Sequence, residues 1–228
     1  MENAISYIEF LINFSPKMLT GIGVTIGQLF CASALAIVIA LIFGLMRLSS
    51  NKIILSVATI YIEFFRGTSL LIQLYWIYYV LPLLINLNLD AFNAGFIALG
   101  LNFGAYGAEI VRGSIQAVPR AQWEAGRALN MSPYLQMRRI IIPQTFSHLL
   151  PPASNLLVEL LKATALVSLI SVTDLMFMSK VFNQTYWMSL QVFGTALIIY
   201  YILARFFLTP FLRWLEVLAA RKMGKTLG

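Results

Sequence analysis

The chain has 228 residues, of which 60% are hydrophobic and 11% charged, and its mean hydropathy is +0.82. A soluble domain carries about 25% charged residues, so this composition excludes an ordinary soluble protein. The formal net charge of +7 would suit a nucleic-acid-binding protein. The basic residues are instead distributed as a membrane topology requires, which argues against nucleic acid as a partner.

Five segments are apolar and long enough to cross a bilayer, which takes about 20 residues. In chain order they are residues 20–46, 66–86, 91–111, 149–172 and 190–212. Lipid tolerates only helices or closed barrels as spanning structures, and the period-two alternation of a barrel is not visible. We therefore predict an all-α integral membrane protein with one transmembrane domain over residues 1–228. An amphipathic segment, Asn51–Phe65, is expected to lie along the surface before the second span.

The basic residues orient these spans, because Lys and Arg concentrate on the cytoplasmic side of a membrane. With the N-terminus outside, Lys17 and Lys180 lie outside and Lys162 falls within a span. The cytoplasmic side then receives Arg47, Lys52, Arg66, Arg112, Arg120, Arg127, Arg138, Arg139, Arg205, Arg213, Arg221, Lys222 and Lys225. We therefore predict a cytoplasmic C-terminus, contacts with anionic lipid, and Arg66 at the cytoplasmic start of the second span.

The longest polar connection, residues 113–143, faces the cytoplasm in this topology and is predicted to be a helical hairpin. Pro119 suits the first position of a helix, and Asn130 can adopt the left-handed conformation that ends one. Ser132 is a good N-cap for a second helix beginning at Pro133, and Pro143 ends that helix or starts the next segment. From these residues alone, the hairpin could equally lie on the bilayer with its arginines against the headgroups.

The hairpin carries a pattern formed by Glu124-Ala125-Gly126, Asn130 and Ile140-Ile141-Ile142-Pro143. It resembles the EAA loop of ABC importer permeases, in which Glu-Ala-Ala is followed by Gly, Ile and Leu-Pro at the same spacing. Gly126, Asn130 and Ile142 depart from that pattern, and Gly126 should cost the helix about 1 kcal/mol relative to Ala. Residues 62–74, 104–119 and 160–175 resemble the polar amino-acid branch of the same family.

The resemblance implies a permease subunit with the architecture of type I ABC importers, in the bacterial cytoplasmic (inner) membrane. It also implies partners: a second permease subunit, identical or paralogous, two cytoplasmic ABC ATPases and an extracytoplasmic solute-binding protein. The ATPases would bind ATP and Mg, so no cofactor, metal or catalytic residue is expected in this chain. Residues 119–143 would couple ATP hydrolysis to alternating access through Trp123, Glu124, Ala125, Gly126, Arg127, Leu129, Asn130, Ser132, Pro133, Ile140 and Pro143.

Polar residues within spans are costly, so each is a candidate for the substrate pathway. Lys162 needs a partner, and Glu159, three residues earlier, shares its helical face; the two form either a neutral structural pair or part of the pathway. Ala163 stands where relatives often carry an acid or amide, which leaves the charge class of the solute open. The candidates are Gln73, Tyr75, Asn102, Glu159, Lys162, Thr164 and Ser168. Interhelical hydrogen bonding is the alternative role for Gln73, Asn102 and Ser168.

The sequence therefore predicts a transporter subunit, not an enzyme, that imports a polar amino acid or a similar zwitterion such as an opine or an ectoine-like solute. A second hypothesis is an ATP-independent carrier or channel for small polar solutes, which would favour an intramembrane acid without a basic neighbour. A membrane enzyme is disfavoured, because the single histidine, His148, has no paired nucleophile or metal-spaced partner. The spacings Gly23–Gly27 and Gly100–Gly104 indicate close helix packing.

Overall fold

The computed structural model describes residues 2–86 and 89–222, and of residues 2–11, 13 and 219–222 it describes the backbone alone. Every element in these ranges is helical, with π or 3₁₀ turns marked η. They are α1 (Glu2–Met46), α2 (Lys52–Gly67), α3 (Leu70–Tyr75), η1 (Trp76–Val80), α4 (Leu81–Ile85), α5 (Ala91–Gln116), α6 (Arg120–Ala128), α7 (Pro133–Gln136), η2 (Met137–Ile141), α8 (Ile142–Ala163), η3 (Thr164–Ile170), α9 (Leu175–Tyr186), α10 (Ser189–Ile202), η4 (Leu203–Leu208) and α11 (Thr209–Lys222).

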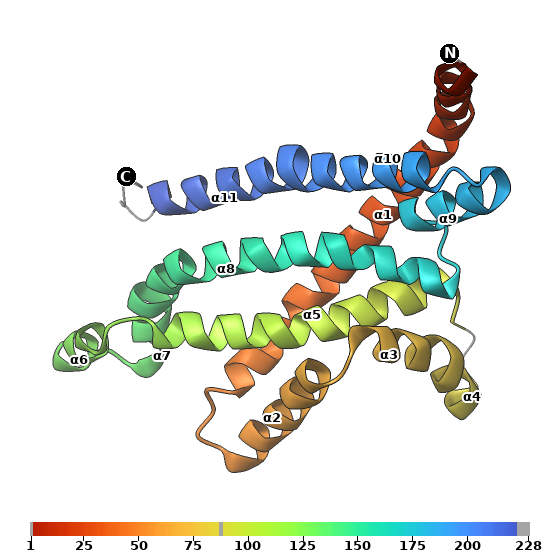
Figure 1. Ribbon diagram of the computed structural model, residues 1–228. Coiled ribbons are helices and arrows are strands. Elements are labelled where there is room, and N and C mark those ends of the chain that lie inside the picture. The colour runs from red at the N-terminus through yellow and green to blue at the C-terminus, as the bar shows by residue number, and fades with distance from the viewer. Residues whose placement is uncertain (1, 87–88, 223–228) are drawn as a thin grey trace.

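The helices form an elongated bundle around α5 (Figure 1). The long helix α1 crosses α5, α8 runs beside α5, α11 packs along α8, and α10 packs against α9. The hairpin of α6 and α7 forms one end of the bundle, while the N-terminus, α4 and α9 lie toward the other. Within the described residues, four helices are long and apolar enough to span a membrane: Phe14–Met46, Ala91–Gln116, Pro133–Ile170 and Ser189–Leu218.

The second predicted span, residues 66–86, belongs to a broken helix. Residues Lys52–Gly67 and Leu70–Ile85 pass the same test together but meet at an angle of 104°. The segment α2, predicted to be a separate surface helix, packs against α5, and the Tyr61 hydroxyl donates to the Leu101 carbonyl at 2.7 Å. The break places Arg66 beside Tyr106 of α5, so Arg66 does not mark the start of a straight span as expected.

Close packing of α1 on α5 depends on small residues. A Cβ atom on Gly104 would lie 2.5 Å from Ile39 Cγ2, and one on Gly100 would lie 2.7 Å from Leu35 Cδ2. Such contacts leave no room for a side chain, so the prediction for Gly100 and Gly104 is confirmed. Gly23, in contrast, has nothing within 4 Å of its Cβ position, and close packing does not explain it.

The predicted fourth span is the second half of a much longer helix. Residues Pro133–Ile170 form one run of 38 residues, so the second helix of the hairpin continues into the membrane-spanning segment without ending at Pro143. A π turn, Met137–Ile141, precedes this proline, and the Ile142 N–H donates to the Met137 carbonyl, five residues back. The wider turn accommodates a residue that lacks an N–H and would clash with the carbonyl four residues earlier in an α-helix.

Candidate functional site

The hairpin is built largely as its sequence predicts. Asn130 has a φ of 51° and ends the first helix in the left-handed region. Ser132 caps the second helix by accepting a hydrogen bond from the Leu135 N–H at 3.3 Å, with Pro133 directly after it. Pro119 is the N-cap of α6 rather than its first helical residue, a shift of one position from the prediction.

The two helices of the hairpin meet at Gly126 and Gln136. Gly126 is buried, and a Cβ atom there would lie 2.5 Å from Gln136 Nε2 and 2.7 Å from its Cδ. This amide is itself buried and donates to the Trp123 carbonyl at 2.6 Å. The glycine that departs from the EAA pattern therefore makes room for a hydrogen bond between the two helices, a reason that the sequence pattern alone did not reveal.

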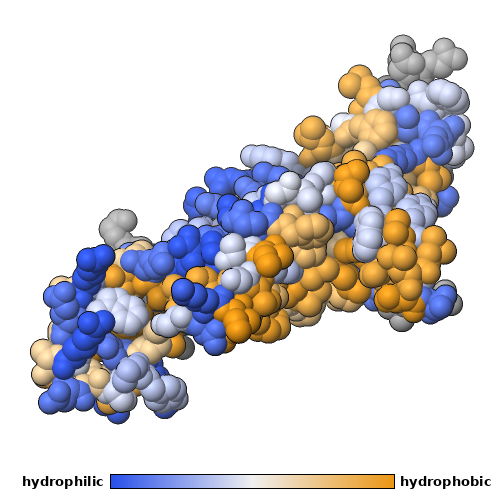
Figure 2. All heavy atoms as spheres, turned by 90° about the horizontal axis from the view of Figure 1, so that it is seen from below, coloured by the Kyte–Doolittle hydropathy of each residue, from blue (hydrophilic) through white to orange (hydrophobic). Residues whose placement is uncertain are grey.

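The predicted coupling residues separate into an outer and an inner set. Trp123 and Ile140 pack with Val111, Ile115 and Ile141 in a hydrophobic cluster that fixes the hairpin to α5. The outer set is exposed and comprises Glu124, Ala125, Arg127, Leu129, Asn130, Ser132, Pro133 and Pro143, beside the exposed ring of Tyr134. Figure 2 shows hydrophilic residues gathered at this end of the molecule and continuing along one edge of its middle part, next to a broad hydrophobic area.

A polar stripe runs along the membrane-spanning part of α8. His148, Asn155, Glu159 and Lys162 are all exposed and follow one another at intervals of three, four or seven residues, which places them on one helical face. Charged groups cost about 2.5–3.5 kcal/mol at the centre of a span. This face therefore needs water or another protein against it rather than lipid.

A cavity of about 410 Å³ opens beside this stripe, between α2, α5 and α8. Its walls include Arg66, Tyr106, Asn155 and Glu159. The Arg66 guanidinium lies 5.3 Å from the centre of the Tyr106 ring, and such an arrangement is attractive. In the part of the chain that the structure describes, Glu159 forms an ion pair with neither Lys162 nor Arg66. The predicted neutral pair of Glu159 and Lys162 is thus not formed in this structure.

Glu109 also lines this cavity, but its charge is already balanced. Its carboxylate lies 2.6 Å from Arg112 Nη2 and 3.3 Å from Arg47 Nε, and Arg47 also donates to the Thr59 hydroxyl at 2.6 Å. These contacts tie Arg47, the residue that follows α1, to α2 and α5.

The other predicted pathway residues lie inside the protein. Gln73 and Asn102 are buried and bonded to each other at 3.0 Å, and both donate to the Phe65 carbonyl at the helix break. Thr164 and Ser168 are also buried; Thr164 donates to the Leu161 carbonyl, and Ser168 accepts from Lys180 Nζ at 3.0 Å. Tyr75 is partly exposed and stacks on Tyr79.

Three side chains of the cavity, Arg66, Tyr106 and Asn155, are not among the pathway residues predicted from the sequence. Arg66 interrupts the apolar stretch of residues 62–74, a signal that is also consistent with the predicted position at the membrane surface. Tyr106 and Asn155 offered none, since only the packing of α5 beside α8 brings them to one cavity.

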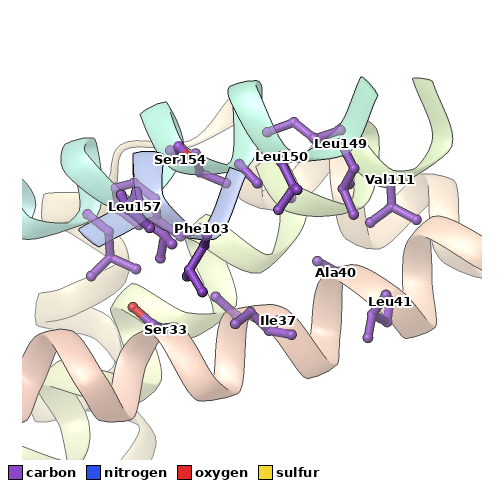
Figure 3. Close-up of a pocket in the computed structure, with 18 residues that line it drawn as sticks. Ser33, Ile37, Ala40, Leu41, Phe103, Val111, Leu149, Leu150, Ser154 and Leu157 are labelled. Atoms are coloured by element: carbon purple, nitrogen blue, oxygen red, sulfur yellow. The ribbon is translucent and has the colours of Figure 1, made fainter. Parts of the chain in front are cut away.

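A second cavity, of about 290 Å³, lies between α1, α5 and α8 and has a different character (Figure 3). Its walls are aliphatic and aromatic, with Ile37, Phe103, Leu150 and Leu157 among them, and Ser33 and Ser154 contribute hydroxyls. Because this cavity offers few hydrogen-bonding groups, it cannot replace the water molecules that a polar solute would lose on entering it. Within the described residues, no group of three or more His, Cys, Asp or Glu side chains is placed to hold a metal ion.

These features define a class: a multi-span helical membrane protein with a structured polar hairpin at one end and a polar face on a spanning helix. Residues 36–220 match the family described as "Binding-protein-dependent transport system inner membrane component". The chain belongs to this family of ABC importer permeases, in its polar amino-acid branch. It is therefore a transporter subunit and a multi-pass membrane protein, of the inner membrane in bacteria.

Curated relatives support this placement. The chain is 43% identical to a probable amino-acid ABC transporter permease, y4tF, of Sinorhizobium fredii (strain NBRC 101917 / NGR234), over 80% of this chain and 78% of the relative. It is 40% identical to the L-cystine permease TcyB of Bacillus subtilis (strain 168), over 72% and 69%. It is 34% identical to the arginine permease ArtQ of Haemophilus influenzae, over 82% and 87%.

Solved structures show the same fold. A crystal structure of an amino acid ABC transporter with histidines has a chain that is 34% identical, with a TM-score of 0.84, covering 90% of this chain and 95% of that one. The inward-facing MetNI methionine ABC transporter shares the fold at 18% identity and a TM-score of 0.71, over the same shares of the two chains. The architecture is that of type I ABC importer permeases.

Proposed function

We propose that this chain forms, with a second permease subunit, the membrane pathway of an importer that moves a polar amino acid or similar zwitterion by ATP-driven alternating access. Two cytoplasmic ATPases would drive it through the hairpin, and an external solute-binding protein would deliver the solute. ATP and Mg would be bound by the ATPases and not by this chain. The names of the relatives, which include glutamine, cystine and arginine permeases, support an amino acid as the solute.

The polar stripe on α8 is the observation that supports this proposal most directly. His148, Asn155, Glu159 and Lys162 are exposed in the single chain, although they lie on a helix long and apolar enough to span the membrane. A second subunit packed against this face would shield it from lipid and enclose a polar pathway. Because the hairpin belongs to the same continuous helix, a displacement there reaches the stripe directly.

The coupling role is tested by Glu124→Arg, since Glu124 is exposed on the hairpin and its carboxylate forms no ion pair within the described residues. The variant should fold normally and keep ATP hydrolysis, but lose most ATP-driven uptake in proteoliposomes that contain the ATPase and the binding protein. The matched control is Glu63→Gln, a change at an exposed acid on α2, which should leave uptake unchanged. Full uptake by Glu124→Arg would refute coupling through this surface.

The alternative, an ATP-independent carrier or channel, makes a different prediction in the same liposomes. It would give uptake without ATPase and nucleotide, driven by a solute or ion gradient alone. The proposed importer would give none.

A further inference from the structure

The apolar cavity between α1, α5 and α8 also has a wall from α11, to which Leu212 and Leu215 contribute. Phe103 of α5 points into this space and is itself only 7% exposed (Figure 3). The Ser154 hydroxyl of α8 donates to the Glu216 carboxylate of α11 at 2.5 Å, so this polar group of the wall already has its partner. What remains of the wall suits an apolar occupant.

The cavity opens between α1 and α11. Ile37 and Leu41 on α1 and Leu215 on α11 line it, yet they are 52%, 46% and 37% exposed. Because α11 packs along α8 rather than along α1, these two helices form the rims of the opening. Both belong to segments long and apolar enough to span a membrane, and both carry further exposed apolar side chains, such as Val38 and Trp214. The opening therefore faces hydrocarbon.

The polar stripe lies on a different face of α8. Asn155 and Glu159 line the polar cavity against α2, and neither of them lines the apolar cavity. A second permease that covers the polar stripe, as proposed above, leaves the opening between α1 and α11 to lipid. Acyl chains are the apolar molecules that surround this part of the protein, so an acyl chain is the occupant that the position of the opening selects.

We propose that the apolar cavity binds a segment of an acyl chain of a membrane phospholipid. Its volume of about 290 Å³ is roughly twice that of an engineered apolar cavity, of about 150 Å³, that binds benzene. A chain segment there gains van der Waals contacts with all four helices, and so links α8, which continues from the hairpin, to α1. On α5 the wall residue Val111 directly precedes Arg112, which is cytoplasmic in the predicted topology, so the lipid belongs to the cytoplasmic leaflet.

The site is tested with the wild-type permease, in complex with its ATPase, in lipid nanodiscs. A small fraction of the lipid is phosphatidylcholine with a photoreactive diazirine halfway along one acyl chain, and mass spectrometry after illumination and digestion locates the labelled residues. Phe103 should be labelled, because it lines the cavity although it is buried. Leu99, on the same helix, is the matched control: it is 1% exposed and does not line the cavity, so it should carry no label.

Two results would overturn the proposal. Label at the exposed residue Val38 without label at Phe103 would show that lipid reaches only the outer surface. Absence of label from both Ile37, on the rim, and Phe103 would show that a second copy of this chain or another protein covers the opening.

Variants that fill the cavity separate a bound chain from general access to lipid. Ala153→Phe adds a ring from the α8 wall and should remove the label at Phe103 while Val38 stays labelled. Ile37→Phe, at the exposed rim, gives the same test should the first variant not fold. Val38→Phe, beside it but not lining the cavity, is the control and should leave Phe103 labelled. Label at Phe103 in both filled variants would contradict the site, and none of these results depends on ATP-driven uptake.

Discussion

Gly126 shows how an unfavourable residue can be required by its surroundings. Glycine costs a helix about 1 kcal/mol relative to alanine, and from sequence it is an unfavourable departure from the family pattern. In the structure Gln136 occupies the space where a Cβ would lie and bonds to the Trp123 carbonyl. The glycine and the glutamine are therefore one feature, visible only when the two helices are packed together.

Because Gly126 and the Gln136 side chain share one space, we predict that Gly126→Ala changes the free energy of unfolding in opposite directions with and without Gln136. In the wild type, Gly126→Ala should lower the free energy of unfolding by about 1 kcal/mol, because displacing the buried amide costs more than the gain in helix propensity. In a Gln136→Ala background the same substitution should raise it by about 1 kcal/mol, since the space is then free. Thermal unfolding of the four proteins measures both, and equal effects in the two backgrounds would exclude the coupling.

Asp174 is a buried acid between the last two spanning helices. Its side chain is fully buried, caps α9 through the Phe177 N–H at 2.8 Å and accepts from the Tyr200 hydroxyl at 3.3 Å. Burial raises the pKa of this carboxyl to about 6, and the hydrogen bonds from Phe177, Met176 and Tyr200 offset only part of that effect. The folded protein therefore binds the proton more tightly than the unfolded chain.

A pH dependence of stability follows from this raised pKa. The carboxyl contributes fully below about pH 4, and its contribution falls by up to about 3 kcal/mol as the pH rises through about 6. Asp174→Asn keeps an N-cap residue but has no such titration. The unfolding temperature of the wild type should rise relative to that of the variant between pH 7.5 and pH 5. A constant difference across this range would contradict the assignment.

At the scale of the elements, three prolines share one arrangement. Pro82, Pro143 and Pro210 each lie two residues after a π turn, and the residue before each proline donates its N–H to a carbonyl five residues back. The π turn removes the clash that would otherwise break the helix. Each helix therefore continues through its proline, although the sequence rule that proline ends a helix predicted a boundary at Pro143.

The π turn at η2 lies between the hairpin and the spanning helix, so we predict that it sets their relative rotation. Pro143→Ala should raise the free energy of unfolding, by up to about 3 kcal/mol, as a better helix former replaces proline. It should also lower the ratio of uptake to ATP hydrolysis, because relaxation of the turn rotates the hairpin. Pro82→Ala, beside the π turn η1, is the control and should change stability alone. Loss of stability in Pro143→Ala would refute this account.

Turns, helix caps and membrane spans can be predicted from the sequence, whereas contacts between helices that are distant in the chain cannot. The turn at Asn130 and the cap at Ser132 depend on neighbouring residues, and the spans depend on runs of apolar ones, so both could be predicted. Arg66 was misplaced because hydropathy does not show a bend of 104°. The burial of Gln73 and Asn102 and the cavity at Glu159 depend on which helices lie side by side, which a single sequence does not specify.

At the scale of the whole molecule, the distribution of basic residues predicts which end faces the cytoplasm. The single cysteine, Cys31, can be replaced by alanine to give a background for labelling. In that background Leu129→Cys, on the hairpin, should react with an impermeant maleimide only from the cytoplasmic side. Trp187→Cys, between α9 and α10 at the opposite end, should react only from outside; both positions are highly exposed. Reversed labelling would overturn the topology and the proposed docking of the ATPase.

The run from Pro133 to Ile170 also has a mechanical consequence. Its 38 residues amount to roughly 57 Å at 1.5 Å per residue, and they carry the hairpin at one end and Glu159 and Lys162 near the other. Under the proposed function, a displacement of the hairpin would be transmitted along this continuous backbone, through the π turn Met137–Ile141, to the face that carries Glu159 and Lys162. No loop interrupts this connection, so the polar face of α8 would move whenever the hairpin moves.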